Sequence, residues 1–268
     1  MAVRSALCMI TGRMDSVFSL LSPTYFILAC AVAILSGVVK GMVGFAMPMV
    51  MISGLTTFMA PDLALAGLIL PTVVTNVIQA MRQGPRAAWA SASQFWVFLV
   101  FGGTALVIAA QFVPRLHPQV LMLMIGVPVI CFALLQLTGK RFRLERRSLK
   151  IEALVGVFAG AIGGLSGIWG PPTVAYLTAL GTQKYEQMRI QGVIYGLGAI
   201  ALFGAHITSG ILRAETLPLS MALVPSAVLG MWVGTKILDR IDQQMFARAT
   251  LVVLLVAGAN LVRRGLMG

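Results

Sequence analysis

Hydrophobic runs separated by short polar or Pro/Gly segments fill almost the whole chain and predict ten helical pieces. The predicted pieces cover residues 24–40, 45–58, 63–81, 91–112 and 118–138 in the first half, and 151–165, 170–180, 188–209, 216–236 and 243–262 in the second. A helix needs about 20 apolar residues to cross a bilayer. Two of the pieces, 45–58 and 170–180, are too short for that and are interpreted as half-helices.

A glycine-rich break precedes each half-helix and recurs in register. Gly37, Gly41, Gly44 and Pro48 correspond to Gly160, Gly164, Gly167 and Pro171, and a second echo links residues 115–121 with 240–246. The fold class predicted is an all-α polytopic membrane protein with two homologous repeats. Each repeat is expected to hold one glycine/proline-interrupted helix pair and three further transmembrane helices, giving about 8–10 helices. The predicted division is an N-terminal extension (1–22), repeat 1 (23–138), a basic cytoplasmic linker (139–150) and repeat 2 (151–268).

Composition supports a membrane protein and disfavours a soluble domain, a nucleic-acid-binding protein and a metalloprotein. Hydrophobic residues make up 59% of the chain and charged residues 10%, whereas soluble domains carry about 25% charged residues. The net charge of +12 comes from Lys and Arg that lie mostly between the hydrophobic runs, which indicates membrane topology and not nucleic-acid binding. Three scattered cysteines and two histidines give no metal or disulfide pattern, so no metal and no cofactor is expected.

The linker between the halves carries six basic residues and one acidic residue, so it is placed in the cytoplasm. Two arrangements satisfy this. If each interrupted pair returns to its starting face, the halves are inverted and both termini are outside. If each pair is one broken crossing, the halves are parallel and both termini are inside. Most Lys and Arg lie inside in either case, and we favour the inverted arrangement because the second pieces are short.

Lys40 is the most informative single residue, because it lies deep in a hydrophobic run directly before Gly41. Burying an ammonium group in a bilayer costs several kcal/mol or more unless the group pairs or reaches the interface. An anionic substrate would be a suitable partner. The alternative is that Lys40 extends to a nearby interface.

The two breaks are also candidate anion sites. A helix N-terminus has unpaired N–H groups and about half a positive elementary charge, so the chain from Phe45 and from Pro171 onward is expected to face one shared midplane site. The alternative is that the glycines form faces for close helix packing.

Polar side chains inside the spans add hydrogen-bonding groups. Thr72, Thr75, Asn76 and Gln79 share one helix face, and Gln94, Gln191 and Tyr195 are further candidates for a polar cavity. The predicted substrate-binding residues are Lys40, Gly41, Gly44, Phe45, Thr75, Asn76, Gly164, Gly167, Pro171, Thr173 and Tyr176.

Acidic residues are almost absent from the predicted spans. Glu152 falls at a span edge beside the linker, and the sequence shows no obvious buried carboxylate to act as a proton carrier. His206 is a candidate for titration near neutral pH. Coupling to protons or another ion, and assembly into an oligomer, are both compatible with the sequence.

The break motifs resemble those of the TauE/SafE family, also called the sulfite exporter or TSUP family. The resemblance rests on residues 41–45 and 163–177 and extends over about residues 24–264. It implies export of anions such as sulfite, sulfonates or sulfoacetate across the bacterial inner membrane. Many members carry a third glycine-rich step after the first break, where this chain has Ala46, Met47 and Pro48.

The leading hypothesis is therefore a secondary transporter of a small sulfur-containing or organic anion, embedded in the lipid bilayer. The alternatives are a passive anion channel and a carrier of a small carboxylate without sulfur. An intramembrane enzyme is disfavoured because no nucleophile–base or paired-carboxylate arrangement is visible in the spans. A membrane subunit that only assembles with other proteins and does not transport is also disfavoured, because it would not need the two polar breaks.

Overall fold

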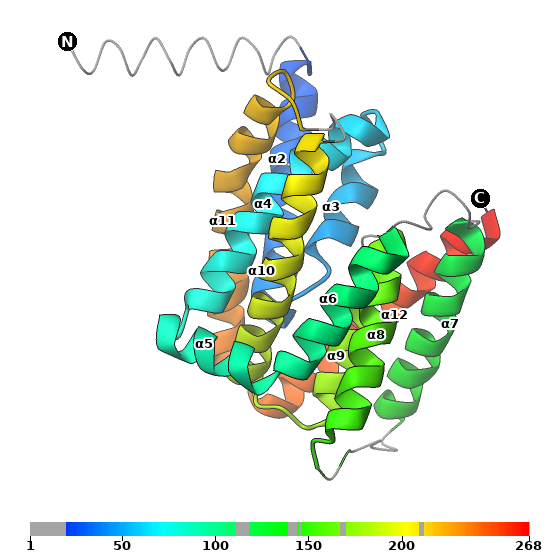
Figure 1. Ribbon diagram of the computed structural model, residues 1–268. Helices are drawn as coiled ribbons and strands as arrows, with labels where there is room; N and C mark the ends of the chain where they lie inside the picture. The colour runs from blue at the N-terminus through cyan, green and yellow to red at the C-terminus, as the bar shows by residue number, and fades with distance from the viewer. Residues whose placement is uncertain are drawn as a thin grey trace. The chain divides into compact units, whose positions relative to one another are not determined.

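A computed structural model describes residues 20–110, 118–138, 144, 146–166, 170–208 and 212–267 (Figure 1). These residues form eleven helices and no strand. The helices are α2 (Pro23–Val43), α3 (Met47–Leu55), α4 (Pro61–Met81), α5 (Pro85–Gln94), α6 (Trp96–Ala110), α7 (Pro118–Leu137), α8 (Leu149–Ser166), α9 (Gly170–Ala179), α10 (Lys184–Thr208), α11 (Leu217–Arg240) and α12 (Gln243–Met267). The prediction of an all-helical chain is confirmed for the described residues.

Four of these helices, α2, α4, α11 and α12, are long and apolar enough to cross a membrane. The pair α5 and α6 together would add a fifth span. Both predicted half-helices are short, since α3 has 9 residues and α9 has 10. The chain is therefore a membrane protein with several apolar helices and two short ones.

The single helix predicted over 91–112 is wrong. The chain bends by 74° between α5 and α6, and Phe95 at the bend has φ −99° and ψ 28°. The half-helix predicted from Phe45 instead begins at Met47, because Gly44 (φ 87°) and Ala46 (φ 68°) are both in the left-handed region. Non-helical backbone thus occupies the first break, as the glycine pattern predicted.

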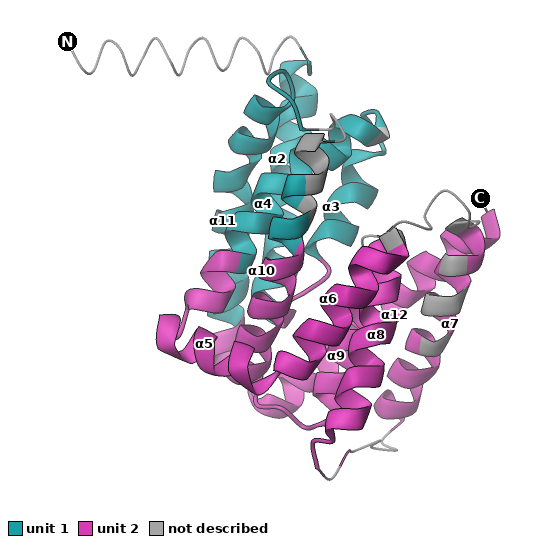
Figure 2. Cartoon of the chain, in the orientation of Figure 1, with its two compact units in different colours: residues 1–42, 47–76, 199–237 teal, residues 43–46, 77–198, 238–268 magenta. Residues whose placement is uncertain are grey.

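The helices group into two compact units (Figure 2). Unit 1 comprises residues 1–42, 47–76 and 199–237, and unit 2 comprises residues 43–46, 77–198 and 238–268. Each unit contains segments from both predicted repeats. The division into repeats itself stays a prediction.

Unit 1 is built on a close contact between α2 and α11. A Cβ atom on Gly37 would lie 2.3 Å from the Ala227 carbonyl oxygen, and one on Gly234 would lie 2.1 Å from that of Val38. Only glycine allows two backbones to approach this closely. The short helix α3 returns alongside α2, because a Cβ on Gly54 would meet Val32 at 2.7 Å.

Pro71 lies inside α4 and leaves a gap in its hydrogen bonding. Proline has no N–H, so the carbonyl of Gly67, four residues earlier, loses its helical donor. Ser220 of α11 supplies hydrogen bonds at this gap. Its hydroxyl donates to the Gly67 carbonyl at 3.4 Å and accepts from the Leu70 N–H at 3.1 Å. In lipid, where water cannot replace these bonds, this side chain stabilises the interrupted helix.

Ser220→Ala is expected to lower the free energy of unfolding by about 1–3 kcal/mol, the usual cost of leaving buried polar groups without a partner. Thermal melting of the detergent-purified protein would measure the change. Ser226→Ala on the same helix is the matched control, and equal melting of the two variants would contradict the bridging role.

Unit 2 contains a second contact of the same kind, between α6 and α8. A Cβ on Gly160 would lie 2.0 Å from the Gly102 carbonyl oxygen, and one on Gly156 would lie 3.0 Å from that of Phe98. The helices α7 and α12 also pack closely, at Gly126 and Gly258. The short helix α9 returns to the start of α8, because the Leu144 N–H donates to the carbonyl of Ala179, the last residue of α9, at 2.8 Å.

The bend at Phe95 is held by a buried ion pair from the start of α8. The Glu152 carboxylate, which is fully buried, accepts from the Phe98 N–H at 3.1 Å and from Arg147 Nε at 2.5 Å. Arg147 also donates to the Gln94 carbonyl and lies over the Phe95 ring. An anion thus caps the N-terminus of α6 and a cation caps the C-terminus of α5, as the two helix dipoles favour. Glu152, placed at a span edge from the sequence, is therefore a buried carboxylate with a structural role.

Glu152→Ala is expected to destabilise the protein by about 3–5 kcal/mol, because it leaves a partly buried guanidinium without its counter-ion. Glu152→Gln, which keeps an acceptor for the Phe98 N–H, should cost less. Chemical or thermal unfolding would rank the variants. Glu215→Ala, which removes an exposed pair with Arg213, is the control and should leave the melting temperature nearly unchanged; a Glu152→Ala variant as stable as this control would refute the capping role.

Candidate functional site

The structure places several of the predicted site residues in two groups, one in each unit. We call Lys40, Thr75 and Asn76 of unit 1 the lysine cluster, and Gly44, Phe45, Gln79, Gly170 and Gln191 of unit 2 the break cluster. The single shared site expected from the sequence stays a prediction.

The lysine cluster joins the last turn of α2 to the middle of α4. Lys40 Nζ donates to Asn76 Oδ1 at 2.5 Å. The Thr75 hydroxyl donates to the Pro71 carbonyl at 2.6 Å and lies 3.4 Å from Met47 Sδ, in the first residue of α3. Of the face predicted from helical spacing, Thr75, Asn76 and Gln79 are buried and Thr72 is half-buried.

Lys40 is buried within the protein, because only 2% of the residue is exposed. Within the described part of the chain, no carboxylate lies within ion-pair distance of it. Its described hydrogen-bond partner, the Asn76 amide, is neutral. A buried ammonium group with only a neutral partner attracts an anion strongly, because the surroundings screen its charge poorly.

Gly41 has a packing role. A Cβ there would lie 2.2 Å from the Met231 carbonyl oxygen, so Gly41 continues the contact of α2 with α11 that begins at Gly37. This is the close-packing alternative considered for the glycines. Gly44, three residues later, behaves differently.

The break cluster holds the backbone of Gly44 with two glutamine side chains. Gln79 Nε2 donates to the Gly44 carbonyl at 3.1 Å and to the Met188 carbonyl at 2.8 Å. Gln191, in the amide orientation that satisfies both its ends, donates to the Gly44 carbonyl at 3.0 Å and to the Val43 carbonyl at 3.2 Å. The carbonyl oxygens freed where α2 ends are therefore bound by protein groups.

The first break lies against the start of α9 within unit 2. A Cβ on Gly170, the first residue of α9, would lie 3.5 Å from the Phe45 ring, and the Tyr195 hydroxyl donates to the Gly170 carbonyl at 3.1 Å. Pro171 and Pro172 follow, so Gly170 and Thr173 carry the two N–H groups among the first four positions of α9. Thr173 is fully buried. The start of α9 therefore offers an anion at most two N–H donors, whereas an ordinary helix N-terminus has four.

The remaining predicted residues lie elsewhere or are not described. Tyr176 is six residues into α9, about 9 Å from its start. Its hydroxyl is buried. Gly164 is half-buried near the end of α8. Gly167 and the side chain of His206 are outside the described residues.

Three comparisons with known proteins bear on identity. A family model described as "Sulfite exporter TauE/SafE" matches residues 29–261. No match was found in the searches of curated proteins and of solved structures. Because the matched region spans most of the 268 residues, the chain belongs to the TauE/SafE sulfite exporter family of membrane transporters.

Proposed function

We propose that this protein is a secondary transporter that exports a small sulfur-containing or organic anion across the bacterial inner membrane. The observation that carries the proposal is Lys40, a buried cation without a carboxylate partner among the described residues. Family membership supports transport of an anion. The substrate, the direction and the membrane are parts of the proposal.

In this proposal the lysine cluster supplies the charge contact. Lys40 binds an anionic oxygen, while Asn76 and Thr75 orient the ammonium group and add hydrogen-bonding atoms. In unit 2, Thr173 and the first N–H groups of α9 are the second candidate contact. Gly41 and Gly44 act through the backbone and not through direct contact with substrate.

The returning half-helices support inverted repeats. The end of α3 lies beside α2, and the end of α9 is bonded next to the start of α8. If each interrupted pair returns to its starting face, each half crosses the membrane an odd number of times. With the basic linker (139–150) inside, the proposal puts both termini outside. The repeats also share a packing pattern, since α2 contacts α11 and α8 contacts α6 through glycines.

Counterflow in proteoliposomes tests the proposal. Vesicles loaded with unlabelled sulfoacetate should accumulate labelled sulfoacetate faster than empty vesicles, because a carrier exchanges substrate across the membrane. Parallel assays with sulfite and with a small carboxylate would identify the preferred class. Flux without stimulation by internal substrate, together with large unitary currents, would favour a channel. Absence of flux for every anion would refute the proposal.

A further inference from the structure

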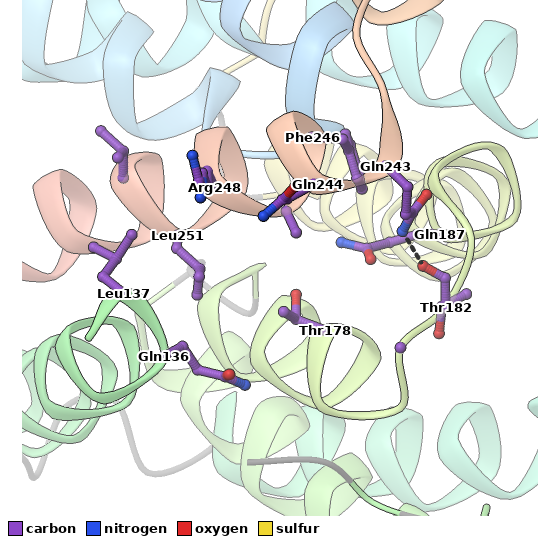
Figure 3. Close-up of a pocket in the computed structure, with 13 residues that line it drawn as sticks. Gln136, Leu137, Thr178, Thr182, Gln187, Gln243, Gln244, Phe246, Arg248 and Leu251 are labelled. Carbon is purple, nitrogen blue, oxygen red and sulfur yellow. Dashed lines mark hydrogen bonds between the residues drawn. The ribbon is translucent and has the colours of Figure 1, made fainter. Parts of the chain in front are cut away.

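A second candidate site lies in unit 2 and is lined by residues that belong to neither cluster. It is a pocket of about 600 Å³, within the range of about 300–1,000 Å³ that is usual for small-molecule sites. The pocket lies between the end of α7, the end of α9, the start of α10 and the first turns of α12 (Figure 3). None of its described lining residues is among the predicted site residues.

The lining combines one cation, several uncharged polar groups and apolar side chains. Arg248 is the cation, the polar groups include Gln136, Gln187, Gln244 and Thr178, and Phe246 and Leu251 are among the apolar residues. None of the described residues that line the pocket is acidic. A negative ligand would therefore find donors and no repelling carboxylate among these residues.

Two lining groups have hydrogen-bonding capacity left over. The Thr178 hydroxyl is buried and has no partner among the described residues, and Figure 3 shows it turned from α9 toward Gln244. Within the described chain, Arg248 forms neither an ion pair nor a hydrogen bond. A buried hydroxyl without a partner costs about 1–3 kcal/mol, so a bound ligand or water would satisfy it.

The pocket is linked to the break cluster through one face of α10. Gln187, which is 2% exposed, lines the pocket, and its Nε2 donates to Gln191 Oε1 at 3.3 Å. Gln191 in turn donates to the carbonyls of Gly44 and Val43. A ligand that touches Gln187 is thus two hydrogen bonds from the first break.

We propose that this pocket is a binding site for a small organic anion, separate from Lys40. The anionic group binds Arg248 and the neighbouring amide and hydroxyl donors, and the hydrocarbon part packs on Phe246 and Leu251. The volume is far larger than a bare oxyanion fills, which favours an organic sulfonate or carboxylate over inorganic sulfite.

The pocket lies at the linker end of unit 2. The end of α9 is bonded to Leu144, within the basic linker, and both α7 and α9 end at the pocket. Because that linker is assigned to the cytoplasm, the pocket would receive anions from the cytoplasmic side. The inference that the pocket loads substrate for export rests on the proposed function. The inference that the pocket binds an organic anion does not depend on it.

Binding is measured with propane-1-sulfonate by calorimetry on the full-length, detergent-purified Lys40→Met variant, so that the Lys40 site does not contribute. We expect one bound anion per chain. Adding Arg248→Gln should weaken the affinity by about tenfold or more, because hydrogen bonds to charged groups are strong. Adding Ala247→Trp should abolish binding by filling the pocket while leaving Arg248 in place.

Arg264→Gln, near the far end of α12, is the matched control and should bind as the Lys40→Met variant does. Propan-1-ol should not bind, and inorganic sulfate should bind more weakly than propane-1-sulfonate. The proposal is overturned if Lys40→Met protein binds no sulfonate, or if Arg248→Gln and Ala247→Trp leave the affinity unchanged. Tighter binding of sulfate would overturn the organic class. These results are independent of whether the wild-type protein transports the anion.

Discussion

Lys40→Met is expected to abolish anion transport while the protein stays folded. Methionine is similar to lysine in length and fills the same buried volume, but it carries no charge to attract the substrate. Removing a buried ammonium group that has no carboxylate partner among the described residues also removes a desolvation cost. The melting temperature should therefore stay the same or rise, while the rate of counterflow falls by about a hundredfold, the effect of losing about 3 kcal/mol of binding.

Lys236→Met provides the control for charge alone. Lys236 lies on α11 of the same unit and is exposed, with its ammonium group 5.5 Å from the Trp232 ring. Its loss should leave transport unchanged. Counterflow at the wild-type rate in Lys40→Met protein would mean that Lys40 does not bind substrate. A loss of folded protein in that variant would instead assign Lys40 a structural role through Asn76.

Gly44→Ala is expected to cause a large loss of stability, because both the packing and the backbone conformation at this position require glycine. A Cβ at this position would lie 1.8 Å from the end of the Gln191 side-chain amide and 2.7 Å from Met188 Sδ. Gln191 would have to move, and the carbonyls of Gly44 and Val43 would lose a donor in a buried site. The left-handed φ of 87° adds the cost of placing an alanine in this conformation. Together, these effects should lower the free energy of unfolding by about 3–6 kcal/mol. Thermal melting and the yield of monodisperse protein would measure it.

Gly84→Ala separates the backbone effect from the packing effect. Gly84 has φ 90°, almost the same as Gly44, but no atom lies within 4 Å of the Cβ position. The Gly84→Ala substitution should lower the free energy of unfolding by only about 1–2 kcal/mol, the penalty for an alanine in the left-handed conformation. Similar melting temperatures for the two variants would show that contact with Gln191 does not matter. Combining Gly44→Ala with Gln191→Ala should recover part of the loss by removing the clash.

Much of the helical framework could be predicted because the hydrophobic runs are long and their ends are marked. Pro118 begins α7 and Pro61 begins α4, where prolines suit a first helical turn. The half-helix at Gly170 was predicted to within a residue at each end, since a glycine and two prolines mark its start. Charge and helical spacing pointed to Lys40, Thr75 and Asn76, which the structure buries together; their role in binding stays a prediction.

Other features depend on contacts between distant segments and leave little trace in the sequence. The bend at Phe95 has no glycine or proline beside it, and its capping pair comes from residues more than 50 positions away. The charges of the linker were interpreted only as topology, although Arg147 binds α5. Gly41 and Gly44 look equivalent in sequence, yet one packs in a helix and the other has a positive φ. Ala46 adopts φ 68°, at the point where many family members continue with a glycine-rich step.

The contact between α2 and α11 has a consequence for synthesis in the cell. Its partners, such as Gly37 and Ala227, are far apart in the sequence, whereas Gly102 and Gly160 of the α6–α8 contact are much closer. At a typical rate of 5–20 residues per second, the glycine face of α2 waits roughly 10–40 s for α11, while α6 waits only about 3–12 s for α8. During that interval a newly inserted α2 exposes to lipid a surface that can accept the wrong helix. The order of translation therefore makes α2 wait much longer for its partner than α6 waits for α8.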